Sequence, residues 1–254
     1  MNRLLAVAAN TFRETVRERV LYNLVFFAIL LTLSGLLLSQ LSIRQDEKIL
    51  KDIGLAAMEL FGTLIAIFIG VGLVSKEIER RSLFPLLAKP VSRDEFFVGK
   101  FFGLGFTLLV NLAVMSVGLY LTLWATGWGV EPSLLRAIYP ILLSLFLVIA
   151  LAMLFSTLTS SALAAVCTVG VVLGGRFSDV IRNMREVAPG APSLFVDALY
   201  YAVPNFRKFD FKDRVVYGDP VPITLLLWVT LYALLYIAFV LGAGLLVFRR
   251  RDFQ

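Results

Sequence analysis

Four long runs without a charged residue constrain this chain more than any other feature. They cover residues 20–43, 101–130, 137–175 and 221–248. A helix needs about 20 apolar residues to cross the hydrocarbon core of a bilayer, and each run reaches that length. The runs show no alternation of polar and apolar residues of the kind that membrane strands of about 10 residues carry. The sequence therefore predicts an all-α polytopic membrane protein.

The number of expected spans is six. The run 137–175 is 39 residues long, enough to cross twice, and the polar stretch Ser156–Ser161 near its middle predicts a hairpin. A further span surrounds Glu59, the one acidic residue within an apolar segment. The expected spans are about 20–43, 54–75, 98–128, 137–156, 160–180 and 221–248.

Basic residues are distributed unevenly between the connecting segments. Segments 2–19, 76–100 and 249–251 contain 13 lysines and arginines, and the two short connections on the opposite side contain four. Cytoplasmic loops of membrane proteins are rich in Lys and Arg, so both termini are expected in the cytoplasm. The long segment 176–220 carries seven more, which weakens this argument. We interpret the net charge of +6 as a signal of orientation and expect no nucleic acid partner.

Residues 2–19 form an expected amphipathic helix before the first span. Leu5, Ala8, Phe12 and Val16 recur at three- to four-residue spacing, and charged residues take the other side. Such a helix is expected to lie in the inner membrane interface. The alternative is a helical extension of the first span.

The densest charge cluster lies between spans two and three. Ser92 and Glu95 have the spacing of a capping box, and Pro90 prevents a helix from running through. A helix is therefore expected to begin at this point. The preceding stretch SLFPLLAK, residues 82–89, is apolar but bounded by charges. An exposed apolar patch needs a partner, either the membrane surface or another protein, and composition alone favours neither.

Other candidate residues lie in or near the later spans. Glu59 either pairs locally near the outer end of its span or takes part in a pathway. Gly170 and Gly174 form a GxxxG motif, which predicts close helix packing with an unspecified partner. Residues 193–206 are too short to cross and are expected to lie as a helix at the outer leaflet, as a movable lid or a static plug. The candidate outer-gate residues of this segment are Tyr200, Tyr201, Pro204, Asn205 and Phe206.

The stretch KEIERRSLFPLLAKPVSRDEFFVGKFFG, residues 76–103, resembles the loop between spans two and three of ABC-2 type transporter permeases. The family pattern has acidic residues, a Leu-Leu pair, Pro-Val-Ser-Arg and a Gly-Lys pair. Ser82 stands where the family commonly has threonine, and Arg81 where it often has glycine. The Pro204-Asn205 pair and the general layout also resemble the family. Within it, the branch linked to multicopper-enzyme maturation is the most similar.

The resemblance implies one ABC-2 type transmembrane domain over residues 1–254, with an interfacial helix at 2–19, a cytoplasmic coupling loop at 76–97 and an extracytoplasmic segment at 181–220. It also implies a second permease copy or homologue, two ABC ATPase subunits, contact with membrane lipids, and an extracytoplasmic partner as an option. ATP and Mg would bind the ATPase subunits, so this chain would hold no cofactor. The implied ATPase-coupling residues are Glu77, Glu79, Arg81, Ser82, Leu83, Phe84, Pro85, Leu86, Leu87, Lys89, Pro90 and Arg93.

The expected function is export of a hydrophobic or lipid-linked substrate across the inner membrane of a prokaryote. Two alternatives remain: an ABC-2 complex that transmits force to an outer partner without transport, and an ion-coupled carrier. A carrier usually buries several ionisable groups, and only Glu59 qualifies. A membrane enzyme is disfavoured, because the chain has no histidine, one cysteine (Cys167), and no expected catalytic or metal-binding residues.

Overall fold

The computed structural model of the chain is all-helical in the parts it describes, residues 3–18, 26–27, 46–79, 92–129, 131–178 and 203–250. This confirms the all-α prediction for those residues. The longer helices are α1 (Arg3–Glu18), α3 (Asp46–Glu79), α5 (Arg93–Ala125), α6 (Leu135–Leu158), α7 (Ser161–Arg176) and α11 (Ile223–Arg250). The short ones are η1 (Pro132–Leu134), η2 (Phe206–Phe209) and α10 (Lys212–Val216).

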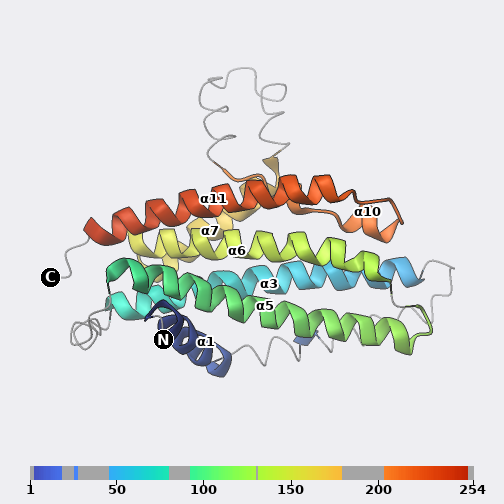
Figure 1. The fold of residues 1–254 in the computed structure, drawn as a ribbon, viewed down its shortest axis with the longest axis horizontal. Helices are drawn as coiled ribbons and strands as arrows, with labels where there is room; N and C mark the ends of the chain where they lie inside the picture. The colour runs from blue at the N-terminus through green and yellow to red at the C-terminus, as the bar shows by residue number, and fades with distance from the viewer. Residues whose placement is uncertain are drawn as a thin grey trace, which may run out of the picture.

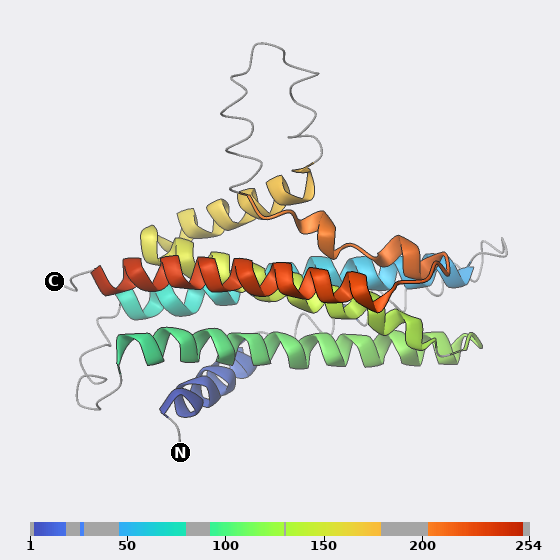
Figure 2. The same cartoon turned by 45° about the horizontal axis from the view of Figure 1, so that its top comes forward.

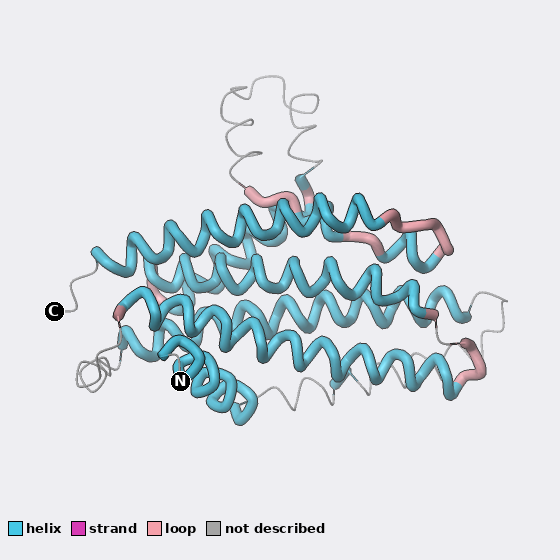
Figure 3. Tube along the Cα trace, viewed as in Figure 1, coloured by secondary structure: helices cyan, strands magenta, loops and turns pink. Residues whose placement is uncertain are grey.

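Four of these helices, α3, α5, α6 and α11, run side by side along the long axis of the molecule (Figure 1). Each is long and apolar enough to cross a membrane. The short loop after α5, which leads to α6, lies at one end of the bundle (Figure 3). Helix α1 crosses α5 at an angle on one side, and α7 lies tilted on the other (Figure 2).

The described residues contain four helices long and apolar enough to be spans and one shorter apolar helix, so the predicted six spans are not confirmed. The first expected span, 20–43, lies outside the described residues except for 26–27, which are helical. The fifth, expected at 160–180, is the 16-residue helix α7, which measures only about 24 Å at 1.5 Å per residue. That length is shorter than a hydrocarbon core of about 30 Å, so α7 is not confirmed as a span.

Burial separates an inner helix from an outer one. The most apolar window of α6 is 72% buried, whereas that of α11 is only 28% buried. Helix α6 packs against α3, α5, α7 and α11, which makes it the centre of the core. The exposed face of α11 carries large apolar side chains such as Trp228 and Phe239. A helix with such a face is suited to contact with lipid.

The predicted hairpin within the 39-residue run is confirmed. Helix α6 ends at Leu158, and the next residue, Thr159, has an extended backbone with φ −135° and ψ 177°. Its hydroxyl donates a hydrogen bond of 3.0 Å to the carbonyl of Phe155 in the last turn of α6. Helix α7 then starts at Ser161 and packs back on α6. The break thus falls within the polar stretch 156–161, where the extended backbone of Thr159 ends α6.

Helix α3 is longer than the span expected at 54–75. It begins at Asp46, so the stretch with Glu47 and Lys51 is helical and not a connecting loop. At its other end it continues to Glu79, as the charged sequence after Val74 predicts. Residues 80–91 of the expected coupling loop lie outside the described part of the chain.

The segment before α11 packs onto the bundle. Phe206, Phe209 and Phe211 are each at most 5% exposed. Val203, Pro204 and Asn205 are not helical, so the expected surface helix over 193–206 does not extend through these three residues. Residues 193–202, with Tyr200 and Tyr201, lie outside the described residues. The three phenylalanines of this segment, Phe206, Phe209 and Phe211, are therefore part of the core.

Candidate functional site

The charged centre of the bundle is a cluster of three residues from three separate elements. Glu59 lies on α3 and is only 7% exposed. Its Oε1 atom is 2.8 Å from Nη2 of Arg176, the last residue of α7. Its Oε2 atom accepts a hydrogen bond of 2.6 Å from Nζ of Lys212, the first residue of α10. The structure thus shows Glu59 paired with residues 117 and 153 positions later in the chain, and a role of Glu59 in a pathway stays a prediction.

Pairing explains how a carboxylate is accommodated at this depth. Burial of a charge without a partner costs on the order of several kcal/mol. A charged side chain therefore stays buried only when it is paired and hydrogen-bonded. Two cations around one carboxylate leave the cluster with one excess positive charge. Lys212 is also 3.9 Å from Oδ1 of Asp210, which balances that charge in part. The cluster holds the end of α7 and the start of α10 against α3.

A close backbone contact lies beside this cluster. A Cβ atom at Gly175 would collide with the carbonyl oxygen of Pro204 and would come within 2.6 Å of Cδ2 of Phe206. Only glycine therefore allows α7 to approach the chain that follows. Asn205 is fixed there as well, because its backbone nitrogen donates a 2.8 Å hydrogen bond to the hydroxyl of Tyr232 on α11. Its side-chain oxygen accepts a 3.0 Å hydrogen bond from the backbone nitrogen of Arg207.

The two glycines of the GxxxG motif differ from Gly175. A Cβ at Gly170 would meet nothing within 4 Å, and one at Gly174 would only touch Val203, at 3.9 Å. Within the described residues of one chain, the motif is thus not at a tight contact. Its role in packing against another chain stays a prediction.

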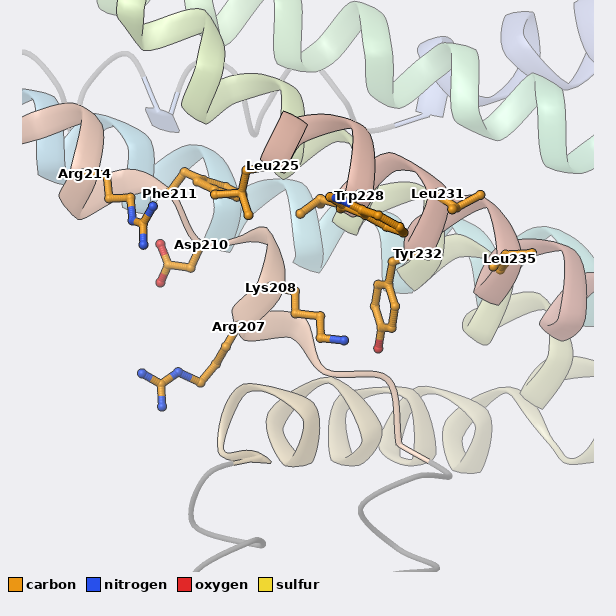
Figure 4. Close-up of a pocket in the computed structure, with 11 residues that line it drawn as sticks. Arg207, Lys208, Asp210, Phe211, Arg214, Leu225, Trp228, Leu231, Tyr232 and Leu235 are labelled. Atoms are coloured by element: carbon orange, nitrogen blue, oxygen red, sulfur yellow. The ribbon is translucent and has the colours of Figure 1, made fainter. Parts of the chain in front are cut away.

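An open groove of about 560 Å³ lies outside the cluster, between the segment 207–214 and α11 (Figure 4). Arg207, Lys208, Asp210 and Arg214 extend from the segment on one side. The opposite wall is apolar and aromatic and belongs to the first half of α11. Lys208 Nζ lies 4.1 Å from the centre of the Tyr232 ring, within the range of a cation–π contact.

The opposite end of the bundle contains the predicted helix start of α5. The hydroxyl of Ser92 accepts a hydrogen bond from the amide of Glu95 at 3.2 Å. The carboxylate of Glu95 accepts one from the amide of Ser92 at 3.0 Å. The capping box is therefore confirmed, and it satisfies backbone donors that a helix start leaves open.

Two further contacts join α5 to its neighbours near this end. Asp94 forms a two-point ion pair with Arg249 of α11, with Nε of Arg249 at 2.7 Å from Oδ1. Helix α1 crosses α5 where Gly103 leaves room: a Cβ there would come within 2.7 Å of the Ala8 carbonyl oxygen and of Thr11 Cβ. The amphipathic helix therefore rests on α5, and Phe12 stacks edge-on against Phe106, with 4.8 Å between ring centres.

The residues expected to couple to an ATPase divide into those outside the described part of the chain and those at the ends of two helices. Arg81, Ser82, Leu83, Phe84, Pro85, Leu86, Leu87, Lys89 and Pro90 lie outside the described residues. Glu77 and Glu79 fall in the last turn of α3, and Arg93 is the first residue of α5. The loop that carries the set is thus bounded by two helices at the end of the bundle where Asp94 binds Arg249.

Sequence reasoning missed several residues that the structure brings together. Arg176 and Lys212 were not assigned as partners of Glu59, but both bind it. Lys51, which is 3% exposed, binds Glu47 at 2.6 Å and Glu131 at 2.9 Å. The available signal was that a lone acid in a span requires cations elsewhere in the chain. Within the described residues, no cluster of three or more His, Cys, Asp or Glu suits a metal ion.

Comparison with known proteins agrees with this architecture. The model of the family described as ABC-2 family transporter protein matches residues 5–177, from α1 to the end of α7. No curated protein matches the chain significantly. The matched region includes the capped start of α5, the α6–α7 hairpin and Glu59. It covers well over half of the 254 residues, and the chain therefore belongs to the ABC-2 transporter family, whose membrane components lack an ATPase domain.

Proposed function

We propose that this chain is the permease subunit of an ATP-driven exporter in the inner membrane of a prokaryote. It pairs with a second permease copy or homologue, and two separate ATPase subunits supply the energy. The cargo is a hydrophobic or lipid-linked compound, since the described spans present mainly apolar side chains. The family match is the observation that carries this proposal.

The arrangement around the coupling loop supports the mechanical part of the proposal. The coupling loop expected at 76–97 includes the last turn of α3 and the first turn of α5, and the capping box gives α5 a well-defined start at Ser92. From there, α5 continues as one helix to Ala125. The Asp94–Arg249 pair ties the same end to α11. A push on the loop is thus transmitted to two spans at once, which is what coupling to an ATPase requires.

The test is replacement of the apolar loop residues. Leu83→Asp and Phe84→Asp should abolish copurification of the ATPase, because a charge enters an apolar docking cleft only at a cost of several kcal/mol, roughly. Gly129→Asp is the matched control, since Gly129 is exposed at the other end of the bundle and has open space around it. Undiminished ATPase binding and ATP-dependent transport in the loop variants would refute docking through residues 82–89.

The topology is proposed with both termini in the cytoplasm. In a Cys167→Ser background, single cysteines at Ser82 and Arg13 should resist an impermeant thiol reagent applied to intact cells. A cysteine at exposed Gly129 should react. Labelling of the first two and protection of the third would invert the orientation.

A further inference from the structure

At the end of the bundle where Asp94 binds Arg249, which we call the loop end, a buried apolar contact also joins α5 to α11. The side chain of Phe97, near the start of α5, is only 2% exposed. Its ring lies against Gly244 of α11, where an added Cβ would come within 3.0 Å of Phe97 Cζ and 3.6 Å of the α-carbon of Leu154 on α6. Any side chain at position 244 would therefore press on the ring. Phe97 thus occupies a notch that the glycine leaves in α11.

The ring of Phe248, one turn after Gly244, completes this contact. Phe248 is 3% exposed, and its ring centre is 5.6 Å from that of Phe97 and 6.5 Å from that of Phe96. Aromatic rings at such distances are in favourable contact. We call Phe97, Gly244 and Phe248 the α5–α11 joint. Because the joint is buried and closely packed, whereas the ion pair beside it is about half exposed, the joint is the firmer of the two connections.

At the opposite end of the bundle, hydrogen bonds hold the first half of α11 on α6. The hydroxyl groups of Tyr139 on α6 and Thr230 on α11 are 2.8 Å apart and share a hydrogen bond. Arg136 of α6 donates a hydrogen bond of 3.4 Å to the carbonyl of Val221, just before α11. Hydrogen bonds tolerate only a narrow range of distance and angle, so these contacts resist a displacement of this part of α11.

Between Thr230 and Gly244, the face of α11 that packs on α6 is apolar. Ala233, Ile237 and Val240 are each at most 8% exposed, and the helix continues through them without a proline. Apolar contacts are non-directional, so packed helices can slide on such a surface by small amounts. At 1.5 Å per residue, Gly244 lies about 21 Å from Thr230 along the helix, so a tilt about Thr230 displaces the joint far more than the hydrogen-bonded end.

We propose that the α5–α11 joint makes the loop end of α11 follow the start of α5, and that α11 tilts about its contacts with α6 near Thr230. Phe97 is a positioning residue in this movement, because it acts on α11 and not on the ATPase or the cargo. The movement rests on the proposed function, since it begins where the ATPase is proposed to bind. The new elements are the side chain that passes the movement on and the half of α11 that moves.

The experiment measures distances between pairs of spin labels in the complex of the full chain with its ATPase subunits. All labels replace exposed side chains in a Cys167→Ser background. Labels at Leu246 of α11 and Leu163 of α7 report on the loop end. Labels at Leu227 of α11 and Leu135 of α6 report on the opposite end. Between the nucleotide-free complex and the complex with a non-hydrolysable ATP analogue, we expect the first distance to shift by about 2 Å, the size of helix movements at packed interfaces, and the second to stay constant.

Replacement of Phe97 should uncouple the two helices. Phe97→Ala should abolish the shift at the loop end while ATP hydrolysis continues, because the emptied notch lets α5 move without α11. Phe101→Ala is the matched control, since Phe101 is also a buried phenylalanine of α5, one turn further on, but its ring faces Phe146 of α6 at 6.3 Å. This control should keep the shift, although it removes the same side chain from the core.

A change on the other side of the joint tests the contact itself. Gly244→Ala should reduce the shift, because the added methyl group pushes the ring out of the notch. Phe97→Leu combined with Gly244→Ala should restore both the shift and the melting temperature, since leucine lacks the Cζ atom that the methyl group would meet. Circular dichroism of each variant checks that the helices are intact. A double variant no better than Gly244→Ala alone would overturn the joint.

The remaining outcomes separate this inference from the proposed function. A shift that persists in Phe97→Ala, or that is lost equally in Phe101→Ala, would overturn the role of Phe97. Equal shifts of both label pairs would show that α11 moves as a whole and would overturn the tilt. Bound, active ATPase subunits without any shift in the wild type would refute the movement alone. A wild-type chain that binds no ATPase would refute the proposed function and the movement with it.

Discussion

The guanidinium group of Arg249 binds both carboxylate oxygens of Asp94, a residue 155 positions earlier in the chain. The pair joins the first turn of α5 to the last turn of α11 beside the loop that we propose to be the ATPase contact. Both side chains are about half exposed, so the pair contributes little to the stability of the fold. We expect the pair to matter for the transmission of motion from the loop to α5 and α11.

Reversal of this pair tests that expectation. Asp94→Arg should reduce ATP-driven transport without a marked change in thermal stability, because it replaces attraction by repulsion between α5 and α11. The double variant with Arg249→Asp should recover transport, since the pair is restored with the charges exchanged. The measurement is the number of substrate molecules moved per ATP hydrolysed. Equal transport in the single and double variants would show that the contact plays no part in coupling.

Loss of Glu59 should be the most damaging single change in the charged cluster. Glu59→Gln leaves Arg176 and Lys212 without their carboxylate, and we expect a loss of about 2–3 kcal/mol in the free energy of unfolding. This lies below the value for a fully buried pair, because the Arg176 side chain keeps 34% of its surface exposed. Glu59→Gln combined with Lys212→Gln should recover part of the loss. Unfolding by denaturant in detergent gives both values, and strictly additive losses would contradict a shared interaction.

Alanine substitutions at the glycines of α7 are expected to have very different effects on the melting temperature. Gly175→Ala should lower the melting temperature, because its Cβ would collide with the Pro204 carbonyl, a backbone atom held in place by the Asn205–Tyr232 hydrogen bond. Gly170→Ala should leave the isolated subunit unaffected, since its Cβ meets open space. Gly170→Leu followed by size-exclusion chromatography then tests the predicted contact with another chain. Equal melting temperatures for the Gly175→Ala and Gly170→Ala variants would refute the close approach.

Removal of the Ser92 cap should loosen the start of α5. Ser92→Ala is expected to cost about 1 kcal/mol, since the amide of Glu95 loses its acceptor. Ser92→Asp is the matched control, because aspartate also caps helix starts. Hydrogen exchange of the first turn of α5 should accelerate in the alanine variant and not in the aspartate variant. Identical exchange in both would show that the cap is dispensable.

A pH dependence is expected at the other end of the bundle. The hydrogen bond from Lys51 lowers the pKa of Glu131 below its ordinary value of 4.5. A lowered native pKa means that the stabilising effect is complete above the ordinary pKa and is lost as the pH falls through the native one. The difference in melting temperature between the wild type and Glu131→Gln should therefore shrink between about pH 5 and pH 3. Because Glu131 is half exposed, the whole effect should stay below about 1 kcal/mol. A difference that is constant with pH would contradict the pairing.

Features encoded within a few residues were predictable from the sequence. The cap at Ser92 depends on a partner three positions away, and the break at Thr159 falls within the polar stretch 156–161. The extended start of α3 was missed because hydropathy treats the charged stretch after Asp46 as a loop. The spacing of Glu47 and Lys51, which form an i,i+4 pair, was a usable helix signal.

Contacts between distant segments were not predictable in the same way. Nothing local in the sequence indicates that Lys212 binds Glu59. The GxxxG spacing selected Gly170 and Gly174, while the close approach occurs at Gly175, because the collision there involves a backbone carbonyl 29 positions later in the chain. Such a contact depends on how α7 is placed relative to the segment that follows, and a spacing rule contains no information on that placement.

The distance along the chain between Glu59 and Lys212 sets an order of events during synthesis. The two residues are 153 positions apart, and a ribosome working at 5–20 residues per second needs roughly 8–30 seconds to make that stretch. Throughout this interval α3 carries its carboxyl group without the lysine that binds it in the finished protein. Arg176 of α7 is made before Lys212, so the carboxyl group first gains one of its two cations, and production of α10 then completes the cluster.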